Sequence, residues 1–204
     1  MTRPLTVACV YKKGSGEFNG EYVRRLRRSV AKHCKAPYRF VCLGEELAFQ
    51  FDRPGYWNKL ELFRKGLFDG PVVYLDLDCL IVNDVTDIFE YPHEFTVLDN
   101  WLHPAQIASG FMAWDGREDL SYILDAYEGS STRHKYGERA VKRGDQGLIQ
   151  DVIRRPVTRI SALFPDRILS YKLHVKPNNS VPRTASIVMF HGRPRPADLD
   201  WRLP

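Results

Sequence analysis

Two aspartates inside an apolar segment constrain this chain more than any other feature. Residues 72–82 have the length and the β-branched and aromatic content of a buried strand, and Asp76 and Asp78 interrupt it. A buried carboxylate is costly unless it is compensated. Residues two apart in an extended chain point to the same side, about 7 Å apart, so the two charges repel unless a divalent cation lies beside them. The segment predicts a metal site at the carboxyl end of a central strand, where open α/β sheets bind ligands.

The segments around this acidic pair alternate between strand and helix patterns, which is typical of an α/β sheet with helical crossovers. The expected strands are 5–11, 38–43, 72–82, 95–98, 111–114 and 187–190. The expected helices are 21–34, 58–68, 120–127 and 145–153, with a single helical turn at 87–89. Residues 128–143 are rich in Gly, Ser and charge and are expected to form a mobile loop. Pro194, Pro196 and Pro204 are expected to exclude further regular structure after the last strand.

The composition fits one globular domain. The chain has 204 residues, of which 44% are hydrophobic, and this is enough to bury a sizeable core. No signal peptide and no membrane span are recognised, so a cytoplasmic location is expected. The four cysteines show no paired spacing, which favours reduced, buried thiols.

The charge is unevenly distributed along the chain. The net charge is +5, yet no Lys or Arg occurs between Asp69 and Asn100, and a basic cluster, Arg24 to Arg28, precedes that acidic segment. An acidic centre within a basic protein suits a cation site that receives a phosphorylated ligand. A solvated surface without a partner explains the Arg24 to Arg28 cluster equally well.

Near the C-terminus, a short apolar strand delivers His191 and Gly192 to a chain reversal. Neutral imidazole is a common metal ligand, although a histidine hydrogen-bonded near the surface is the simpler interpretation. Arg193 and Arg195 follow, and both are suited to gripping a phosphate through bidentate contacts.

Three other short motifs carry polar groups at element boundaries. Asp145 and Gln146 open an expected helix, where Asp145 serves either as N-cap or, with Gln146, as a hydrogen-bonding partner of a polyhydroxylated ligand. Ser109 and Gly110 precede a strand, and the glycine permits close approach of a ligand unless it only forms a turn. Lys59 lies at a helix start, where its charge is disfavoured unless a phosphate binds there; a solvated lysine is the alternative.

Together and in this order, these motifs resemble the metal-dependent nucleotide-sugar glycosyltransferases of the GT-A fold. The chain is most similar to glycosyltransferase family 8, the glycogenin and lipopolysaccharide galactosyltransferase group. The resemblance extends from Leu5 to about Pro196. It is carried by Asn58-Lys59-Leu60, Val73 to Asp78, Asp84 to Phe89, Ala108 to Met112, Asp145-Gln146 and Phe190 to Pro196.

The resemblance implies a single α/β domain, residues 1–204, with a Rossmann-like, mixed and mostly parallel central sheet and flanking helices. A C-terminal tail, about 192–204, would close over the donor site. The implied activity is transfer of a sugar from a nucleoside diphosphate sugar, UDP-sugar above all, to an acceptor hydroxyl with retention. The resemblance does not require a catalytic base. Inversion would require one, for which Asp145 or Asp115 are candidates.

The resemblance also assigns roles to individual residues. Asp78 and His191 would bind a divalent cation, Mn²⁺ or Mg²⁺, and Asp76 would bind the metal, the donor ribose or both. The other implied donor contacts are Val10, Tyr11, Lys59, Ser109, Gly110, Gly192, Arg193 and Arg195. Asp145 and Gln146 would face the donor sugar and the reaction centre as catalytic residues.

The sequence departs from the family pattern at several positions. Ala108 replaces a common asparagine, Gly147 replaces an acidic or amide residue, and Arg195 replaces a lysine. The tryptophan that commonly follows the lysine-proline pair is absent, although Trp201 lies nearby. The identity of the donor sugar is therefore left open.

Two other functions remain as alternatives. Phosphohydrolases of the haloacid dehalogenase type also place two aspartates after an apolar strand, but usually near the N-terminus and with a later acidic pair. A non-catalytic nucleotide-sugar binding protein is the second alternative. The acceptor is not identified by the sequence: a glycan, lipopolysaccharide, a protein and modified DNA all remain open, because the basic surface suits an anionic acceptor.

Overall fold

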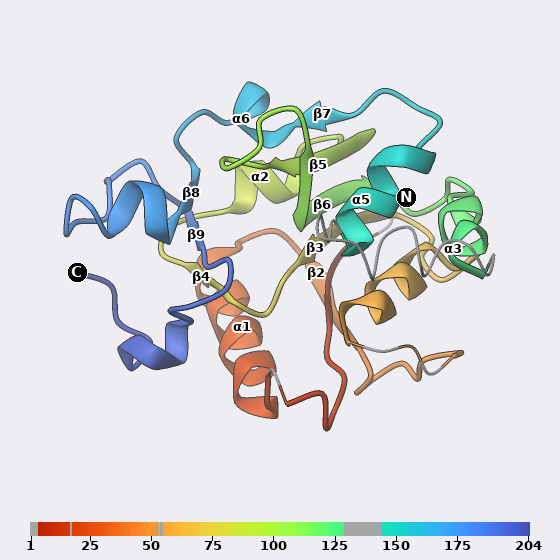
Figure 1. Ribbon diagram of the computed structural model, residues 1–204, viewed down its shortest axis with the longest axis horizontal. Coiled ribbons are helices and arrows are strands. Elements are labelled where there is room, and N and C mark those ends of the chain that lie inside the picture. The colour runs from red at the N-terminus through yellow and green to blue at the C-terminus, as the bar shows by residue number, and fades with distance from the viewer. Residues whose placement is uncertain (1–3, 17, 52, 54, 129–143) are drawn as a thin grey trace.

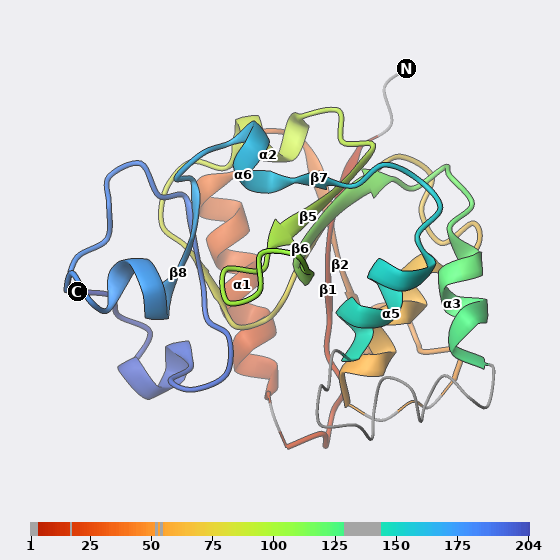
Figure 2. The same ribbon diagram turned by 45° about the horizontal axis from the view of Figure 1, so that its top comes forward.

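A six-stranded mixed sheet forms the centre of the protein (Figures 1 and 2). The computed structural model describes residues 4–16, 18–51, 53, 55–128 and 144–204. The strand order is β2-β1-β3-β6-β5-β7. The strands are β1 (Leu5–Val10), β2 (Tyr38–Leu43), β3 (Pro71–Leu75), β5 (Phe95–Asp99), β6 (Ile107–Asp115) and β7 (Thr158–Arg159). Strands β1–β2, β1–β3 and β5–β7 pair in parallel, whereas β6 runs antiparallel to β3 and β5, so the predicted mixed, mostly parallel sheet is confirmed.

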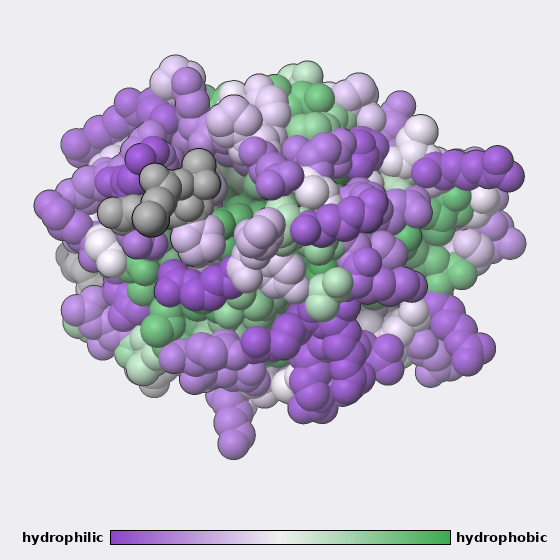
Figure 3. Space-filling model, turned by 180° about the vertical axis from the view of Figure 1, so that it is seen from behind, coloured by the Kyte–Doolittle hydropathy of each residue, from purple (hydrophilic) through white to green (hydrophobic). Residues whose placement is uncertain are grey.

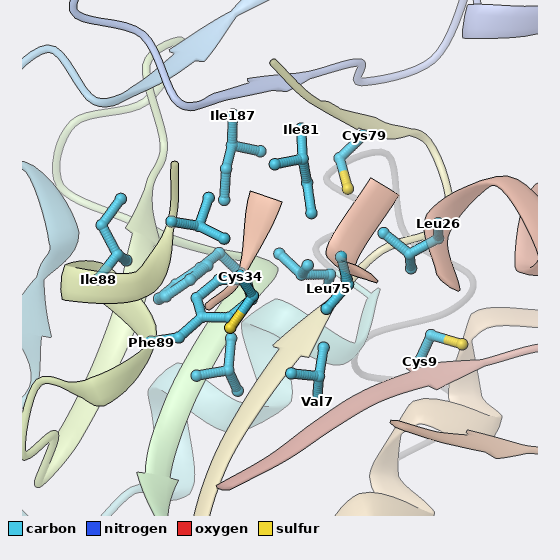
Figure 4. Packing of buried hydrophobic residues seen from close by; sticks show 14 of the residues in the cluster. Val7, Cys9, Leu26, Cys34, Leu75, Cys79, Ile81, Ile88, Phe89 and Ile187 are labelled. Atoms are coloured by element: carbon cyan, nitrogen blue, oxygen red, sulfur yellow. The ribbon is translucent and has the colours of Figure 1, made fainter. Parts of the chain in front are cut away.

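Helices cover both faces of this sheet, and the sequence alternation of the strands matches the two faces. Val73 and Leu75 of β3 belong to one buried cluster with residues of α1 (Gly20–His33) and α2 (Thr86–Glu90). Figure 4 shows Leu75 in this cluster with Leu26 of α1 and with Ile88 and Phe89 of α2. Val72 and Tyr74 point to the opposite face. There they pack with the 3-10 helix η1 (Gly55–Phe63), α3 (Ser121–Glu128) and α5 (Gly144–Val152). A strand covered on both sides reads as a continuous apolar run, which explains the segment at 72–75.

A second, smaller sheet lies beside the first one and has the order β4-β9-β8. Its strands are β4 (Cys79–Ile81), β9 (Ile187–Met189) and β8 (Ile168–Ser170). The prediction of one strand over 72–82 is therefore wrong, because the chain leaves the large sheet after Leu75 and enters the small sheet at Cys79. Asp76 and Asp78 therefore lie in the short segment where the chain passes from the large sheet to the small one. The Asp76 N–H donates to the Gly110 carbonyl at 2.8 Å in the large sheet, and the Asp78 carbonyl accepts from the Phe190 N–H at 2.9 Å in the small one.

Several other expectations need correction. The helix expected at 58–68 is the 3-10 helix η1, which ends at Phe63. The prolines do not exclude regular structure after β9, because Pro196 begins the 3-10 helix η3 (Pro196–Leu199), and proline is compatible with a first helical position. The sequence did not predict β7, α6 (Ile160–Leu163), β8 or the π-helix η2 (Tyr171–Val175). Of the loop expected at 128–143, residues 129–143 lie outside the described residues.

The surface and the cysteines agree with the composition. Figure 3 shows a face that is mostly hydrophilic, with small, separate hydrophobic areas. All four cysteines are buried and free. Among the described residues there is no helix with the length and apolar content needed to cross a bilayer.

Candidate active site

Two cavities meet at the crossing between the sheets. The larger cavity has a volume of about 370 Å³ and the smaller cavity about 180 Å³, and both are lined by Tyr56, Lys59, Asp76 and Asp78. Most of the residues predicted from the sequence line one of them. The larger cavity adds Ser109, Gly110, Asp145, Gln146, His191 and Gly192, and the smaller cavity adds Val10 and Arg195.

Lys59 is the centre of a buried polar network between the two cavities. Its Nζ atom lies 3.0 Å from Asp76 Oδ1, 3.0 Å from Asp145 Oδ2 and 3.0 Å from Ser109 Oγ. An ammonium group has three N–H donors, so these three acceptors saturate it. Ser109 Oγ in turn donates to Asp145 Oδ2 at 2.6 Å. Lys59 of η1 thus joins Ser109 of β6 and Asp145 of α5 to Asp76, and the interpretation of Lys59 as a solvated lysine is wrong.

The sequence around Lys59 fixes the helix that carries it. The Asn58 side chain donates to the carbonyls of Arg53 and Gly55 at 2.6 and 2.9 Å. Glu61 forms a fully buried ion pair with Arg53, and its oxygens also accept from the backbone N–H groups of the preceding loop. Burying a charge pair is tolerated only with such further hydrogen bonds. These contacts hold η1 against the sheet and aim Lys59 at the acids.

The charges of the network explain the protonation of Lys59 and Tyr74. Burial lowers the pKa of Lys59, but the charges of Asp145 and Asp76 outweigh burial, so the pKa lies above its usual value. Tyr74 is buried on the same face of the sheet, and its hydroxyl donates to Asp76 Oδ1. Burial, followed by the charge of Asp76, raises the pKa of Tyr74 well above its usual value. At neutral pH Lys59 is therefore a cation and Tyr74 a neutral donor, and both contact Asp76 Oδ1.

Asp78 lacks comparable compensation. Burial and the neighbouring charge of Asp76 raise the pKa of Asp78 to about 8, against the smaller opposing effects of Arg195 and Lys59. The raised pKa means that too little positive charge lies near Asp78 to stabilise its carboxylate. A divalent cation beside Asp76 and Asp78 would supply that charge. The residues present therefore fit a cation at this position.

His191 follows the strand that pairs with Asp78, but its ring is engaged elsewhere. His191 Nε2 lies 2.7 Å from the Oγ of Ser170, a completely buried residue at the end of β8. Burial, and then the charges of Lys172 and His174, lower the pKa of His191, which keeps the imidazole neutral. A neutral imidazole is the form that binds metals.

The ligand atoms of the three predicted metal ligands are not gathered in one place. In the described part of the chain, only Cys42, Glu45 and Glu46 form a trio whose ligand atoms all lie within 4.8 Å of one another. For Asp76, Asp78 and His191 to share one cation, side chains have to turn, beginning with the His191 ring that Ser170 holds. Their assignment as ligands stays a prediction.

Two predicted donor contacts lie away from the cavities, and several residues were missed. Tyr11 belongs to the buried core, and Arg193 is exposed and paired with Asp198, so neither is among the residues lining the two cavities. Asp145 lies within the first turn of α5 and bonds Ser109 and Lys59, so it is not the N-cap. The missed residues are Tyr56, Tyr74, Trp101 and Ser170. Only Tyr74 carried a sequence signal, since it is two residues before Asp76 and shares its side of the strand.

Gly110 has a packing role that gives a testable prediction. A Cβ atom at this position would lie 2.9 Å from Met189 Cε and 3.2 Å from Asp76 Oδ2. We expect Gly110→Ala to displace the Asp76 carboxylate, to lower any ligand-binding or catalytic activity of the site at least tenfold, and to destabilise the fold by about 1 to 3 kcal/mol. Urea unfolding and a ligand-binding assay measure the two effects.

Gly20→Ala provides the matched control for this substitution. Gly20 begins α1 away from both cavities, and an added Cβ meets only the end of the Arg24 side chain at 3.4 Å and that of Glu45 at 3.8 Å. The control should be neutral or stabilising by about 0.4 to 1 kcal/mol. If Gly110→Ala and Gly20→Ala both leave ligand binding at the site unchanged, the close packing of Gly110 against Asp76 is not needed for binding.

Comparisons with known proteins agree with this architecture. No family model matches the chain, and no curated protein sequence matches it. Among solved structures, the glycosyltransferase GlyE of Streptococcus pneumoniae TIGR4 aligns with a TM-score of 0.59 and 14% identity over 96% of this chain. This chain covers 56% of the length of GlyE. The galactosyltransferase LgtC, solved with donor and acceptor sugar analogues, aligns with a TM-score of 0.63 and 12% identity, covering 94% of this chain and 88% of LgtC.

These likenesses define the class of fold. The mixed sheet, its flanking helices and the neighbouring small sheet form a GT-A glycosyltransferase fold, as the resemblance of the motifs predicted. An identity of 12 to 14% shows the fold alone. The activity has to be argued from the site.

Proposed function

We propose that the protein is a metal-dependent glycosyltransferase that moves a sugar from a nucleoside diphosphate sugar, UDP-sugar above all, to an acceptor hydroxyl. The observation that carries this proposal is the position of the acidic pair at the junction of two cavities on a GT-A fold. A nucleotide sugar has two unlike halves joined by a diphosphate, and two cavities joined at a candidate cation site match that shape.

The lining of the two cavities supports a separate place for each half of the donor. The smaller cavity lies at the end of β1 and has Val10, Phe18 and Arg195 in its wall, which suits a base and ribose followed by a phosphate. The larger cavity has Asp145, Gln146 and Ser109 on one side, which suits the hydroxyls of a donor sugar. It also extends past Trp101 and Leu102, which leaves room for the acceptor.

Asp76, Asp78 and His191 would hold the cation. Carboxylate oxygens with one imidazole suit Mn²⁺ at least as well as Mg²⁺. When bound, the metal would neutralise charge on the diphosphate that leaves. Arg195 supports the same charge from the C-terminal tail, because it lines the smaller cavity and acts electrostatically on Asp78.

The other residues of the site position and bind the reactants. Lys59 fixes Asp76 and Asp145 and leaves their remaining oxygens to the ligand. Asp145 and Gln146 hold the donor sugar at the wall of the larger cavity. With retention, as in the family 8 resemblance, the departing phosphate accepts the proton of the acceptor hydroxyl, and no further base is required. Asp145 is the candidate base if the enzyme inverts.

A ligand screen tests this proposal. UDP- and GDP-sugars at about 100 times their Kd, with Mn²⁺, should stabilise the fold by about 2.7 kcal/mol and raise Tm by roughly 5 to 10 °C for a domain of this size. The shift should need both nucleotide and metal, and His191→Ala should reduce it greatly. Slow hydrolysis of the donor, followed by product analysis, reports the transfer step.

Other outcomes of the same screen would favour the alternatives. Release of phosphate from an aryl phosphate would indicate a phosphohydrolase of the haloacid dehalogenase type. Tight donor binding without transfer or hydrolysis would indicate a nucleotide-sugar binding protein. Absence of any shift with every nucleotide sugar would contradict the proposed donor class.

A further inference from the structure

A continuous stack of rings and guanidinium groups connects the C-terminal tail to the smaller cavity. Arg195 lies over the Phe18 ring at 4.3 Å, and Phe18 meets Tyr22 edge-on at 5.0 Å. Tyr22 in turn meets Trp201 edge-on at 4.6 Å, and the Arg25 guanidinium covers Trp201 at 4.6 Å. Arg195 and Trp201 of the tail each pack on rings or a guanidinium group of the segment that contains α1, so the two parts of the chain hold each other.

The two ends of this stack differ in their surroundings. Arg195 and Phe18 line the smaller cavity, and the charge of Arg195 acts on Asp78. Trp201 and Arg25 lie at a separate groove of about 440 Å³ and line neither cavity of the site. Trp201 is thus joined to the donor site through the stack and through its own segment of chain.

The tail between these two ends is a closed turn. Pro196 to Leu199 form η3, the Arg195 N–H donates to Asp198 Oδ2 at 2.8 Å, and the Trp201 N–H donates to the Pro196 carbonyl at 2.8 Å. Because the turn is closed by these bonds, the place of Trp201 on α1 fixes the place of Arg195.

We infer that Trp201 is a positioning residue for donor binding, which anchors the tail on Tyr22 and Arg25 and thereby holds Arg195 at the diphosphate position. This inference rests on the proposed function for its donor, and on the stack alone for the anchoring.

The test combines Trp201→Ala with two measurements. Hydrogen–deuterium exchange of residues 193–200 in the ligand-free protein reports the anchoring, and should increase at least tenfold in the variant. Calorimetric affinity for UDP with Mn²⁺ reports the donor site, and should fall about five- to tenfold, since an aromatic pair and a cation–π contact are lost. Affinity for Mn²⁺ alone should stay unchanged, which a general collapse of the site would not allow.

Matched variants separate positioning from a loss of stability. Trp201→Phe keeps a ring on Tyr22 and should restore most of the UDP affinity, and Arg25→Gln should cost only about twofold. In an Arg195→Ala background, Trp201→Ala should cause no further loss of UDP affinity, because Trp201 acts through Arg195.

The results test two claims separately: that Trp201 anchors the tail, and that this anchoring supports donor binding. Unchanged exchange in the tail of Trp201→Ala overturns the anchoring. Increased exchange with unchanged UDP affinity, or an equal further loss in the Arg195→Ala background, overturns the link to the donor. A wild-type protein that binds no nucleoside diphosphate contradicts the proposed function and with it the donor link, while the exchange measurement still decides the anchoring.

Discussion

Replacing Lys59 with methionine is expected to lower the free energy of unfolding by about 3 to 5 kcal/mol, the largest loss of stability from a single substitution in this site. The Lys59 side chain is 7% exposed and its Nζ atom is 3.0 Å from both Asp76 and Asp145. Methionine fills a similar volume but leaves the two carboxylates without their shared cation. Urea unfolding at pH 7 in EDTA measures the loss.

Two further variants show whether the lost charge is the cause. Lys65 also lies about as close to an acid, 2.9 Å from Asp119, but both side chains are exposed, by 78% and 48%. Lys65→Met should therefore change stability by no more than about 0.5 kcal/mol. Adding Asp145→Asn to Lys59→Met should recover part of the stability, because it removes one of the two acids left unpaired. Equal losses at Lys59 and Lys65 would show that burial of the ammonium group is unimportant.

The local patterns of the sequence predicted much of the fold. The strand at 38–43 coincides with β2, and the helix at 21–34 differs from α1 by one residue at each end. The spacing of Tyr22, Val23, Leu26 and Val30 is sufficient there, because all four are buried on one helix face. The break of the segment 72–82 was not predictable in this way. Its apolar residues continue on both sides of Asp76 and Asp78, and only the pairing with Gly110 and Phe190, remote in sequence, divides it between two sheets.

The candidate site shows the same limit. The sequence located Asp76, Asp78, Asp145 and His191, and the fold places all four at the larger cavity. It did not reveal that Lys59 joins Asp76 to Asp145. This contact brings η1, the end of β3 and α5 together, and these elements are far apart in the sequence. Nor did it reveal Ser170, which bonds His191 from a strand too short to give a pattern. Motifs indicated the candidate residues, and tertiary contacts decided their partners.

Asp78→Asn is expected to have opposite effects on activity and on stability. Loss of the carboxylate should reduce metal-dependent sugar transfer at least about 1000-fold, because stabilisation of the leaving diphosphate depends on the cation site. The same change should stabilise the metal-free protein at neutral pH by about 1 to 2 kcal/mol, because folding of the wild type has to protonate the buried Asp78 carboxylate and folding of the variant does not. Donor hydrolysis with Mn²⁺ and urea unfolding in EDTA measure the two effects.

The pH dependence of this stabilisation identifies its cause. The pKa of Asp78 is raised to about 8 by burial and by Asp76, whereas an unfolded aspartate has a pKa of about 3.9. Between these values the unfolded chain is ionised and the folded protein is not, so wild-type stability is lost as the pH rises from about 4 to about 8. The advantage of Asp78→Asn should therefore grow over this range and stay constant above it. Asp125→Asn, at an exposed position of α3, should change neither activity nor stability by more than a small amount. An advantage that is independent of pH, or a transfer rate that survives the substitution, would contradict the assignment of Asp78 as the buried acid of the cation site.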